Sequence, residues 1–110
     1  MIRVSLLYPS VPGGRFDHAY YEARHIPLAL ELLGPAVRSI TVERGVAPGG
    51  PWPAPTYVCI CHIVCTSLQA YQDAVMRHGA RLQADLPNYS DSPPTIQVGE
   101  LTGSWPQVER

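Results

Sequence analysis

The side chains best suited to chemistry gather in one stretch, residues 16–29, which reads FDHAYYEARHIPLA. An imidazole can accept and release a proton near neutral pH, and a tyrosine hydroxyl beside it can donate or accept a hydrogen bond. We therefore take His25, helped by Tyr21, as the candidate catalytic pair, with Tyr20 as a further candidate. The alternative is that His25 is a core histidine satisfied by a nearby carbonyl or carboxylate, and that the tyrosines are core aromatics.

The same stretch carries the signals of a helix, which we predict from residue 17 to about residue 33. Asp17 suits the N-cap, because its carboxylate can accept hydrogen bonds from the backbone N–H groups of the first turn. Phe16 and Tyr21 then occupy the two positions that form a hydrophobic staple. The Gly-Pro pair at 34–35 is the usual order of residues at a helix end.

One stripe of this helix is expected to face the interior. Its members, spaced at i, i+4, i+7 and i+11, are Tyr21, His25, Leu28 and Leu32. Pro27 has no backbone N–H, so the carbonyl of Ala23 lacks its helical partner. Such a carbonyl beside a buried imidazole can fix the tautomer of that imidazole, or can face a ligand or water.

The rest of the chain supplies the elements that must position these residues. Strands are predicted at 2–8, 37–45, 56–65 and 94–101. A second helix is predicted from a Thr66 cap, with Gln69 at the capping-box position, to about His78. Gly79 should break it, and residues 80–86 should form a further short turn before Pro87.

The order β-α-β-β-α-β is typical of an α+β, ferredoxin-like fold with a four-stranded antiparallel sheet and both helices on one face. We expect one domain over residues 1–110. Residues 46–55, rich in proline and glycine, should form a surface loop between two antiparallel strands, and residues 102–110 should form a tail.

The predicted strand at 56–65, TYVCICHIVC, is apolar on both faces, which is typical of a central strand covered on both sides. Two helices cover only one face of the sheet, so a lone chain would expose the other as a large apolar patch. We therefore predict a homodimer that packs sheet against sheet. A charged residue at Ile63, which shares parity with Cys59 and Cys61, is the substitution expected to test that interface.

Composition excludes several classes of partner. The net charge of −1 gives no electrostatic reason to expect nucleic acid or an anionic membrane. No apolar run approaches the roughly 20 residues that span a bilayer. The first residues alternate like a strand and lack a cleavage site of small residues, so we expect a cytoplasmic protein.

The cysteines and glycines do not predict a cofactor. Cys59, Cys61 and Cys65 share one strand face without a CxxC pair, and His62 points to the opposite face, so neither a disulfide framework nor a zinc site is indicated. There is no phosphate-binding glycine motif and no serine in a nucleophile elbow. We expect no metal and no cofactor.

Over residues 4–101 the chain resembles the EthD family of the dimeric α/β-barrel superfamily. The resemblance is carried by LLYP at 6–9, by FDHAYYEARHIPLA, by Tyr57 and by HGARLQADLPNYSDSPPTIQVGE at 78–100, in which D-[IL]-P-N-[YF] is followed by P-x-x-Q. The chain departs from the family pattern in its proline-rich 46–55 loop, and in Cys65 where an aromatic residue is expected.

The resemblance implies a ferredoxin-like dimer whose sheets close into a barrel, with a cleft between sheet and helices in each protomer. The positions that carry over from the family motif are Tyr20, Tyr21, His25, Pro27, His78, Asp85, Pro87, Asn88 and Tyr89. Asp85 also has a structural interpretation as the brace of a turn. For His78, at a predicted helix C-terminus, we favour a structural role, because a cation there interacts well with the last carbonyl groups of the helix.

We add Tyr57 and His62 to this set, so the candidate ligand-binding residues are Tyr20, Tyr57, His62, Asp85 and Tyr89. Relatives in the superfamily include cofactor-free isomerases, dehydratases and monooxygenases that act on lactones and aromatic polyketides, and others that bind haem. The sequence therefore leaves two functions open. One is cofactor-free proton transfer, of isomerase, dehydratase or lyase type, on a small organic or aromatic metabolite of a catabolic or biosynthetic pathway. The other is non-catalytic metabolite binding, or support of an oxygenase system.

Overall fold

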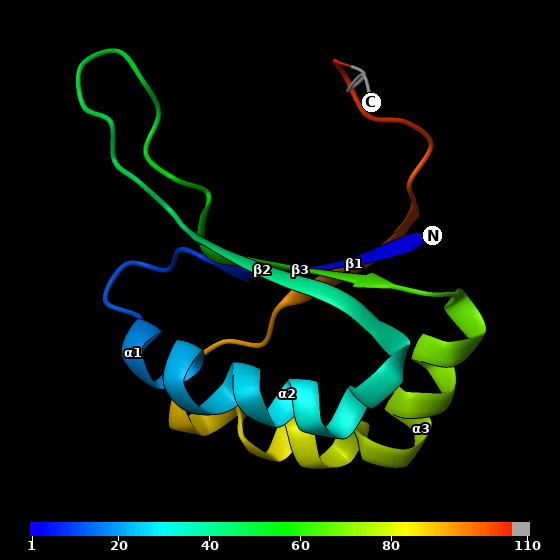
Figure 1. Cartoon of the computed structure of the whole chain (residues 1–110). Coiled ribbons are helices and arrows are strands. Elements are labelled where there is room, and N and C mark those ends of the chain that lie inside the picture. Colours follow the sequence, from blue (N-terminus) through cyan, green and yellow to red (C-terminus); the bar gives the residue numbers. More distant parts are fainter. Residues whose placement is uncertain (107–110) are drawn as a thin grey trace.

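Four antiparallel strands form one sheet, and the helices all pack on one of its faces (Figure 1). The computed structural model describes residues 1–106. The strands are β1 (Ile2–Pro9), β2 (Val37–Arg44), β3 (Tyr57–Cys65) and β4 (Thr95–Glu100), in the spatial order β2-β3-β1-β4. The predicted ferredoxin-like arrangement is confirmed, with β3 as a central strand. Of the predicted tail, residues 107–110 lie outside the described residues.

The first helical region begins and ends where the sequence predicts. The Asp17 side chain accepts a hydrogen bond from the Tyr20 backbone N–H at 3.0 Å, which confirms the N-cap. The rings of Phe16 and Tyr21 lie 5.2 Å apart, as the staple requires. Gly34 ends the helix with a φ of 56°, in the left-handed region that glycine adopts without strain.

This region contains a wide π-helical turn between two α-helical pieces. The helices α1 (His18–Tyr20) and α2 (Ile26–Leu33) flank a π-helical segment (Tyr21–His25). The backbone N–H of Ile26 donates to the carbonyl of Tyr21, five residues earlier, as in a π-helix. Pro27 supplies the physical reason, because it has no N–H with which to continue the regular ladder.

The π-helical turn shifts the buried stripe by one residue. An extra residue in one turn rotates all later positions by about 100°, the angle between successive residues of an α-helix. Beyond His25 the buried residues are therefore Ala29 and Leu33, and the prediction of Leu28 and Leu32 was wrong.

The second long helix, α3 (Leu68–Ala84), corrects two predictions. Its cap is Ser67, which accepts from the Ala70 N–H at 3.1 Å, and not Thr66. The helix also runs through Gly79 without a break, so His78 lies inside it and not at its C-terminus. One helical glycine costs about 1 kcal/mol, less than the burial of an apolar helix face contributes.

The two faces of the sheet differ in what covers them. On β3, Cys59, Cys61, Ile63 and Cys65 are buried against the helices. Ile63 is therefore a core residue, and its assignment to the face opposite the helices was wrong, because parity groups residues without saying which group the helices cover. That opposite face, here called the outer face, carries Leu7, Ile60 and Val64, all partly buried.

Two segments extend from the sheet on the side away from the helices (Figure 1). They are the β2–β3 loop and residues 101–106, which follow β4. Trp52 in the loop is 70% exposed, which agrees with the predicted surface position. No helix among residues 1–106 is long and apolar enough to cross a membrane.

Deleting residues 48–53 tests how little the β2–β3 loop contributes to the fold. The loop adds no residue to the buried core, so we expect the melting temperature to change by only a few degrees, which corresponds to about 1 kcal/mol. Circular dichroism during thermal unfolding measures this. Loss of the cooperative transition would mean that the loop packs as part of the core.

Candidate functional site

A cavity of about 350 Å³ lies between the helix-covered face of the sheet and helices α2 and α3. Its walls are mostly aliphatic, and the lining residues include no arginine, lysine, aspartate or glutamate. This volume is in the range of small-molecule sites, which are mostly apolar with a few convergent polar groups.

Four aromatic side chains with polar groups cluster at one part of the cavity wall: Tyr8, Tyr21, His25 and Tyr89, while Tyr71 and Gln83 add polar groups from α3. The ring of His25 lies 5.2 Å from that of Tyr21, nearly parallel, and 4.6 Å from that of Tyr89. The hydroxyls of Tyr8 and Tyr89 are 2.9 Å apart and hydrogen-bonded. The first helical region, β1 and the segment after α3 thus meet at one cluster.

His25 is held from behind by Asp85, the last residue before the short helical turn Leu86–Asn88. His25 Nδ1 and Asp85 Oδ2 are 2.8 Å apart, and the two side chains are only 9% and 12% exposed. The other carboxylate oxygen of Asp85 accepts from the Tyr20 hydroxyl at 2.7 Å and from the Asn88 amide at 2.9 Å.

These contacts determine the charge of Asp85. Burial raises the pKa of this carboxyl group, but the hydrogen bonds from Tyr20, Asn88 and His25 outweigh it and bring the pKa below its usual value. Asp85 is therefore a carboxylate at neutral pH.

An ionised Asp85 fixes the tautomer of His25. A carboxylate can only accept hydrogen bonds, so His25 Nδ1 carries the proton and donates it. Nε2 is then the basic nitrogen of the neutral ring, and it has no hydrogen-bond partner among the described residues. Nε2 is also not fully buried. Among the described residues, His18 Nδ1 is the only side-chain nitrogen or oxygen that is fully buried without a hydrogen-bond partner. His25 lines the cavity and its Nδ1 is engaged by Asp85, so Nε2 is the ring nitrogen left to interact with a molecule bound there.

The phenols around His25 are hydrogen-bond donors and not bases. Burial raises the pKa of Tyr8, Tyr21 and Tyr89 above the usual value, so all three stay protonated at physiological pH. The pKa of Tyr20 is also raised, chiefly by its hydrogen bond to Asp85. Tyr21 can therefore polarise a bound oxygen atom but cannot take up a proton.

The structure brings together five of the seven candidate residues and leaves two apart. Tyr57 pairs with Pro9 at an irregular end of the sheet and does not line the cavity. His62 lies on the outer face, with Nδ1 2.9 Å from the Ser5 hydroxyl and Nε2 3.5 Å from Glu43. Neither residue faces the cavity that His25 lines.

Sequence reasoning missed Tyr8 and Tyr71, which line the cavity from β1 and α3. Tyr8 could have been found from its parity with Val4, once the covered face was known.

Cys61 also lines the cavity, but burial raises the pKa of its thiol, which argues against a thiolate nucleophile. No group of three or more potential metal ligands occurs among residues 1–106.

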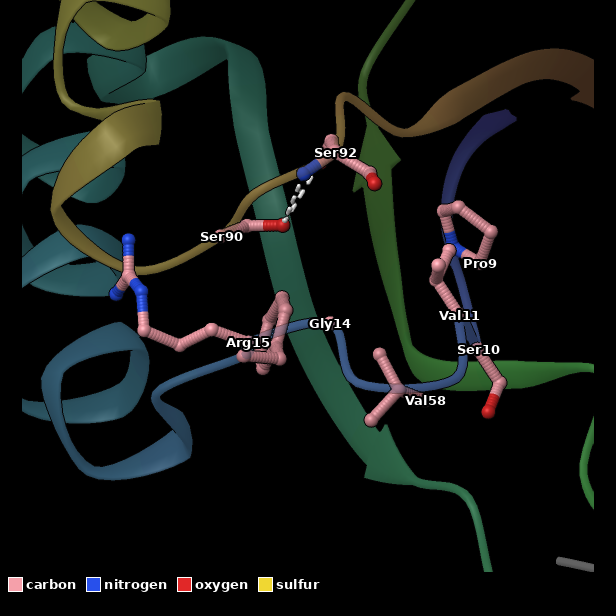
Figure 2. A pocket seen from close by; sticks show the side chains of 9 residues that line it. Pro9, Ser10, Val11, Gly14, Arg15, Val58, Ser90 and Ser92 are labelled. Atoms are coloured by element: carbon pink, nitrogen blue, oxygen red, sulfur yellow. Dashed lines mark hydrogen bonds between the residues drawn. The ribbon is translucent and has the colours of Figure 1, made fainter.

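A second pocket, of about 140 Å³, lies where the end of β1 meets the chain between α3 and β4 (Figure 2). The Ser90 hydroxyl accepts from the Ser92 N–H at 3.1 Å and donates to the Ser92 carbonyl at 2.7 Å. Figure 2 shows the Arg15 side chain directed away from the pocket, where it donates to the carbonyls of Pro87 and Asn88. No imidazole, carboxylate or phenol lines this pocket.

Comparisons with known proteins identify the family. The family model described as EthD domain matches residues 15–93, which include His25, Asp85 and Tyr89. The chain belongs to the EthD family. A crystal structure of an EthD-like protein from Ralstonia eutropha superposes with a TM-score of 0.85 at 39% identity, covering 90% of this chain and 89% of that one.

More distant structures share the fold. An EthD family protein from Bacillus halodurans has a TM-score of 0.69 at 20% identity, covering 93% of this chain and 99% of its own. SnoaB from Streptomyces nogalater, described as a cofactor-independent oxygenase, has a TM-score of 0.60 at 13% identity, covering 96% and 95%. Among curated proteins no relative of this chain was found.

Replacing Asp85 by asparagine should remove a pH-dependent part of the stability. The folded pKa of Asp85 is lowered, so its contribution is fully present above the unfolded value of about 3.9 and is lost as pH falls through the folded pKa. We expect Asp85→Asn to cost roughly 1.5–3 kcal/mol at pH 7, and the two proteins to converge in acid. Urea unfolding between pH 2 and pH 7 measures this.

The matched control is Asp73→Asn, which changes an exposed carboxylate within α3, the helix that Asp85 follows. It should follow the wild-type pH profile. Equal profiles for Asp85→Asn and Asp73→Asn would show that the His25–Asp85 contact does not stabilise the fold.

Proposed function

We propose that the EthD-family cavity binds a small uncharged organic molecule, and that His25 moves a proton on that molecule without a cofactor. The observation that carries the proposal is the orientation of His25, whose Nδ1 is held by the Asp85 carboxylate and whose Nε2 is left to interact with a molecule in the apolar cavity that His25 lines. A base oriented by a carboxylate is the arrangement that proton transfer requires.

The lining of the cavity argues for the charge of the ligand. A carboxylate or phosphate would lose its hydration there without gaining a cationic partner, because no arginine or lysine lines the cavity. A neutral molecule with one polar end suits the cluster of three phenols and an imidazole. We therefore propose ligands that carry a carbonyl or hydroxyl group on a ring or a hydrocarbon frame.

The proposed step is an enolisation. Nε2 of His25 takes a proton from a carbon next to the carbonyl, and the electron pair of the broken C–H bond forms the enolate. Hydroxyl donors of the Tyr8, Tyr21 and Tyr89 cluster stabilise the enolate oxygen. Asp85 stabilises the imidazolium that forms. Return of a proton to the same carbon gives exchange with solvent, whereas in a β,γ-unsaturated ketone return of the proton to the γ-carbon of the dienolate moves the double bond into conjugation with the carbonyl and completes an isomerisation.

A second candidate is binding without catalysis, as a metabolite carrier or as an accessory to an oxygenase. The hydrogen bonds that Asp85 makes with His25 and Tyr20 also tie the first helical region to the end of α3. This bracing favours a purely structural role for Asp85 and His25, and the cavity would still hold a ligand.

We also propose a homodimer formed through the outer face of the sheet. The side chains of Leu7, Ile60 and Val64 make the centre of this face apolar, and no helix covers it. Soluble monomers rarely leave such a patch open to water. The β2–β3 loop and residues 101–106 extend on the same side and would flank a second copy.

His25→Gln separates the two candidate functions. Glutamine keeps a hydrogen-bonding group of similar size but cannot take up a proton near pH 7. We expect the wild type to accelerate exchange of the benzylic α-protons of beta-tetralone with D2O. His25→Gln should lose about 10²–10⁴-fold of that rate while remaining folded. Proton NMR measures the exchange.

The matched control is His62→Gln, which changes a histidine outside the cavity and should exchange at the wild-type rate. His25→Ala should lose the same activity and also some stability, because it leaves a cavity and removes a donor to Asp85. If beta-tetralone binds and His25→Gln exchanges it as fast as the wild type, His25 is not the base. Binding with no acceleration even by the wild type would favour the non-catalytic function.

Ile60→Asp tests the proposed dimer. A carboxylate in the centre of the outer face would be desolvated without a partner in a sheet-to-sheet interface, so we expect monomers at micromolar concentration. Light scattering measures the mass, and Ala80→Asp on the exposed side of α3 is the control that should leave the dimer intact. A wild-type monomer, or an unchanged Ile60→Asp dimer, would contradict the proposed interface.

A further inference from the structure

Helix α3 presents one stripe of residues to the cavity, and one member of that stripe has no side chain. The stripe is Tyr71, Val75, Gly79, Leu82 and Gln83, and Leu86 in the short turn after the helix continues it. These positions follow the i, i+4, i+8, i+11 pattern of a single helix face. Every member except Gly79 places a large side chain there, so the cavity wall is recessed at Gly79.

The backbone does not require a glycine at position 79. Gly79 lies in the interior of α3 and is not among the glycines with positive φ. In a helix interior glycine is less favourable than alanine, because it loses more backbone freedom on folding. The helix conformation alone would favour another residue here.

Close packing could require it at one contact only, and there the Val75 side chain would have to move by a few tenths of an ångström. A Cβ atom built on Gly79 would meet only Val75, with Cγ1 at 3.1 Å and Cβ at 4.0 Å. No atom of α2 or of the sheet lies within 4 Å of that position. The helices therefore do not approach each other closely through Gly79, and the space in front of it belongs to the cavity.

We infer that Gly79 is a specificity-determining residue, whose missing side chain leaves room for the apolar end of the ligand. Asp85, the partner of His25, is the C-cap residue of α3 and lies six residues after Gly79, which corresponds to about 9 Å along the helix axis. A ligand with its polar group at the His25 cluster thus reaches the Gly79 recess only if it carries a hydrocarbon extension. The ligand class is a neutral phenol or enolisable carbonyl compound with an alkyl or second-ring substituent.

The inference rests on the proposed ligand cavity, but not on proton transfer. Its probe is a series of para-alkylphenols from para-cresol to para-hexylphenol, with binding measured by calorimetry. Each buried methylene contributes about 0.8 kcal/mol, or about fourfold in affinity. In the wild type the affinity should rise with each added carbon until the recess is filled.

In Gly79→Ala and Gly79→Val the rise should stop at a shorter alkyl chain, earlier for valine than for alanine. The affinity for para-cresol should change less than twofold, while that for the longest phenol the wild type binds well should fall at least tenfold. Since the added methyl group of Gly79→Ala lies close to Val75, the same substitution is repeated in a Val75→Ala background, which relieves that contact.

The matched control is Ala80→Gly, which moves a glycine to the next, exposed position of the helix. It should lower the melting temperature and leave the whole binding series unchanged. The double variant Gly79→Ala/Ala80→Gly keeps the composition of the helix and should bind like Gly79→Ala.

The series is also measured in His25→Gln, which keeps the two proposals distinguishable. The alkyl-chain length at which the affinity stops rising depends on the shape of the cavity and not on proton transfer by His25. A shortened limit in both backgrounds supports the role of Gly79 even if proton transfer fails. If the chain-length limit is the same in Gly79→Ala as in the wild type, the inference is overturned. A lower melting temperature of that variant would then indicate that Gly79 serves packing. A wild type that binds no member of the series overturns the inference together with the ligand cavity.

Discussion

The hydrogen bond between His25 Nδ1 and Asp85 Oδ2 is the contact on which the rest of the site depends. It joins the first helical region to the end of α3, two segments that lie 60 residues apart in the chain. Tyr20 and Asn88 complete the coordination of the same carboxylate, which keeps Asp85 ionised and therefore keeps the proton on Nδ1. Because Nδ1 is engaged in this one contact, Nε2 is the nitrogen left to interact with a ligand in the cavity that His25 lines.

Pro27 has a role in this geometry that the sequence only partly reveals. Its missing N–H was predicted to free the Ala23 carbonyl, but not to produce a π-helical turn. That turn stacks Tyr21 on His25 and shifts the buried stripe to Ala29 and Leu33. A regular period of 3.6 residues cannot anticipate such a shift, because the extra residue in the turn is a response to the proline and to packing. The small side chain of Ala29 at the shifted position also leaves room for the cavity.

The order of elements, the sheet and the caps near Asp17 could be predicted because they depend on local patterns. Which residues meet across the fold could not. Family resemblance placed His25, Tyr20 and Asp85 in one set without pairing them, whereas His62 and Tyr57 fell on strand positions that do not reach the cavity. The buried face of β3 was grouped correctly but assigned to the wrong side, and Gly79 was taken for a helix break because composition does not show the burial that carries a helix through a glycine.

The most direct test of the central claim is nitrogen NMR of the wild-type protein labelled with ¹⁵N-histidine, recorded with and without para-propylphenol. The His25 signals are assigned from the His25→Gln spectrum. The account predicts that the neutral ring carries its proton on Nδ1, and that the phenol shifts the Nε2 resonance much more than Nδ1 as it donates a hydrogen bond to Nε2. A neutral ring that carries its proton on Nε2, or bound phenol that leaves both nitrogens of His25 unchanged, would contradict it.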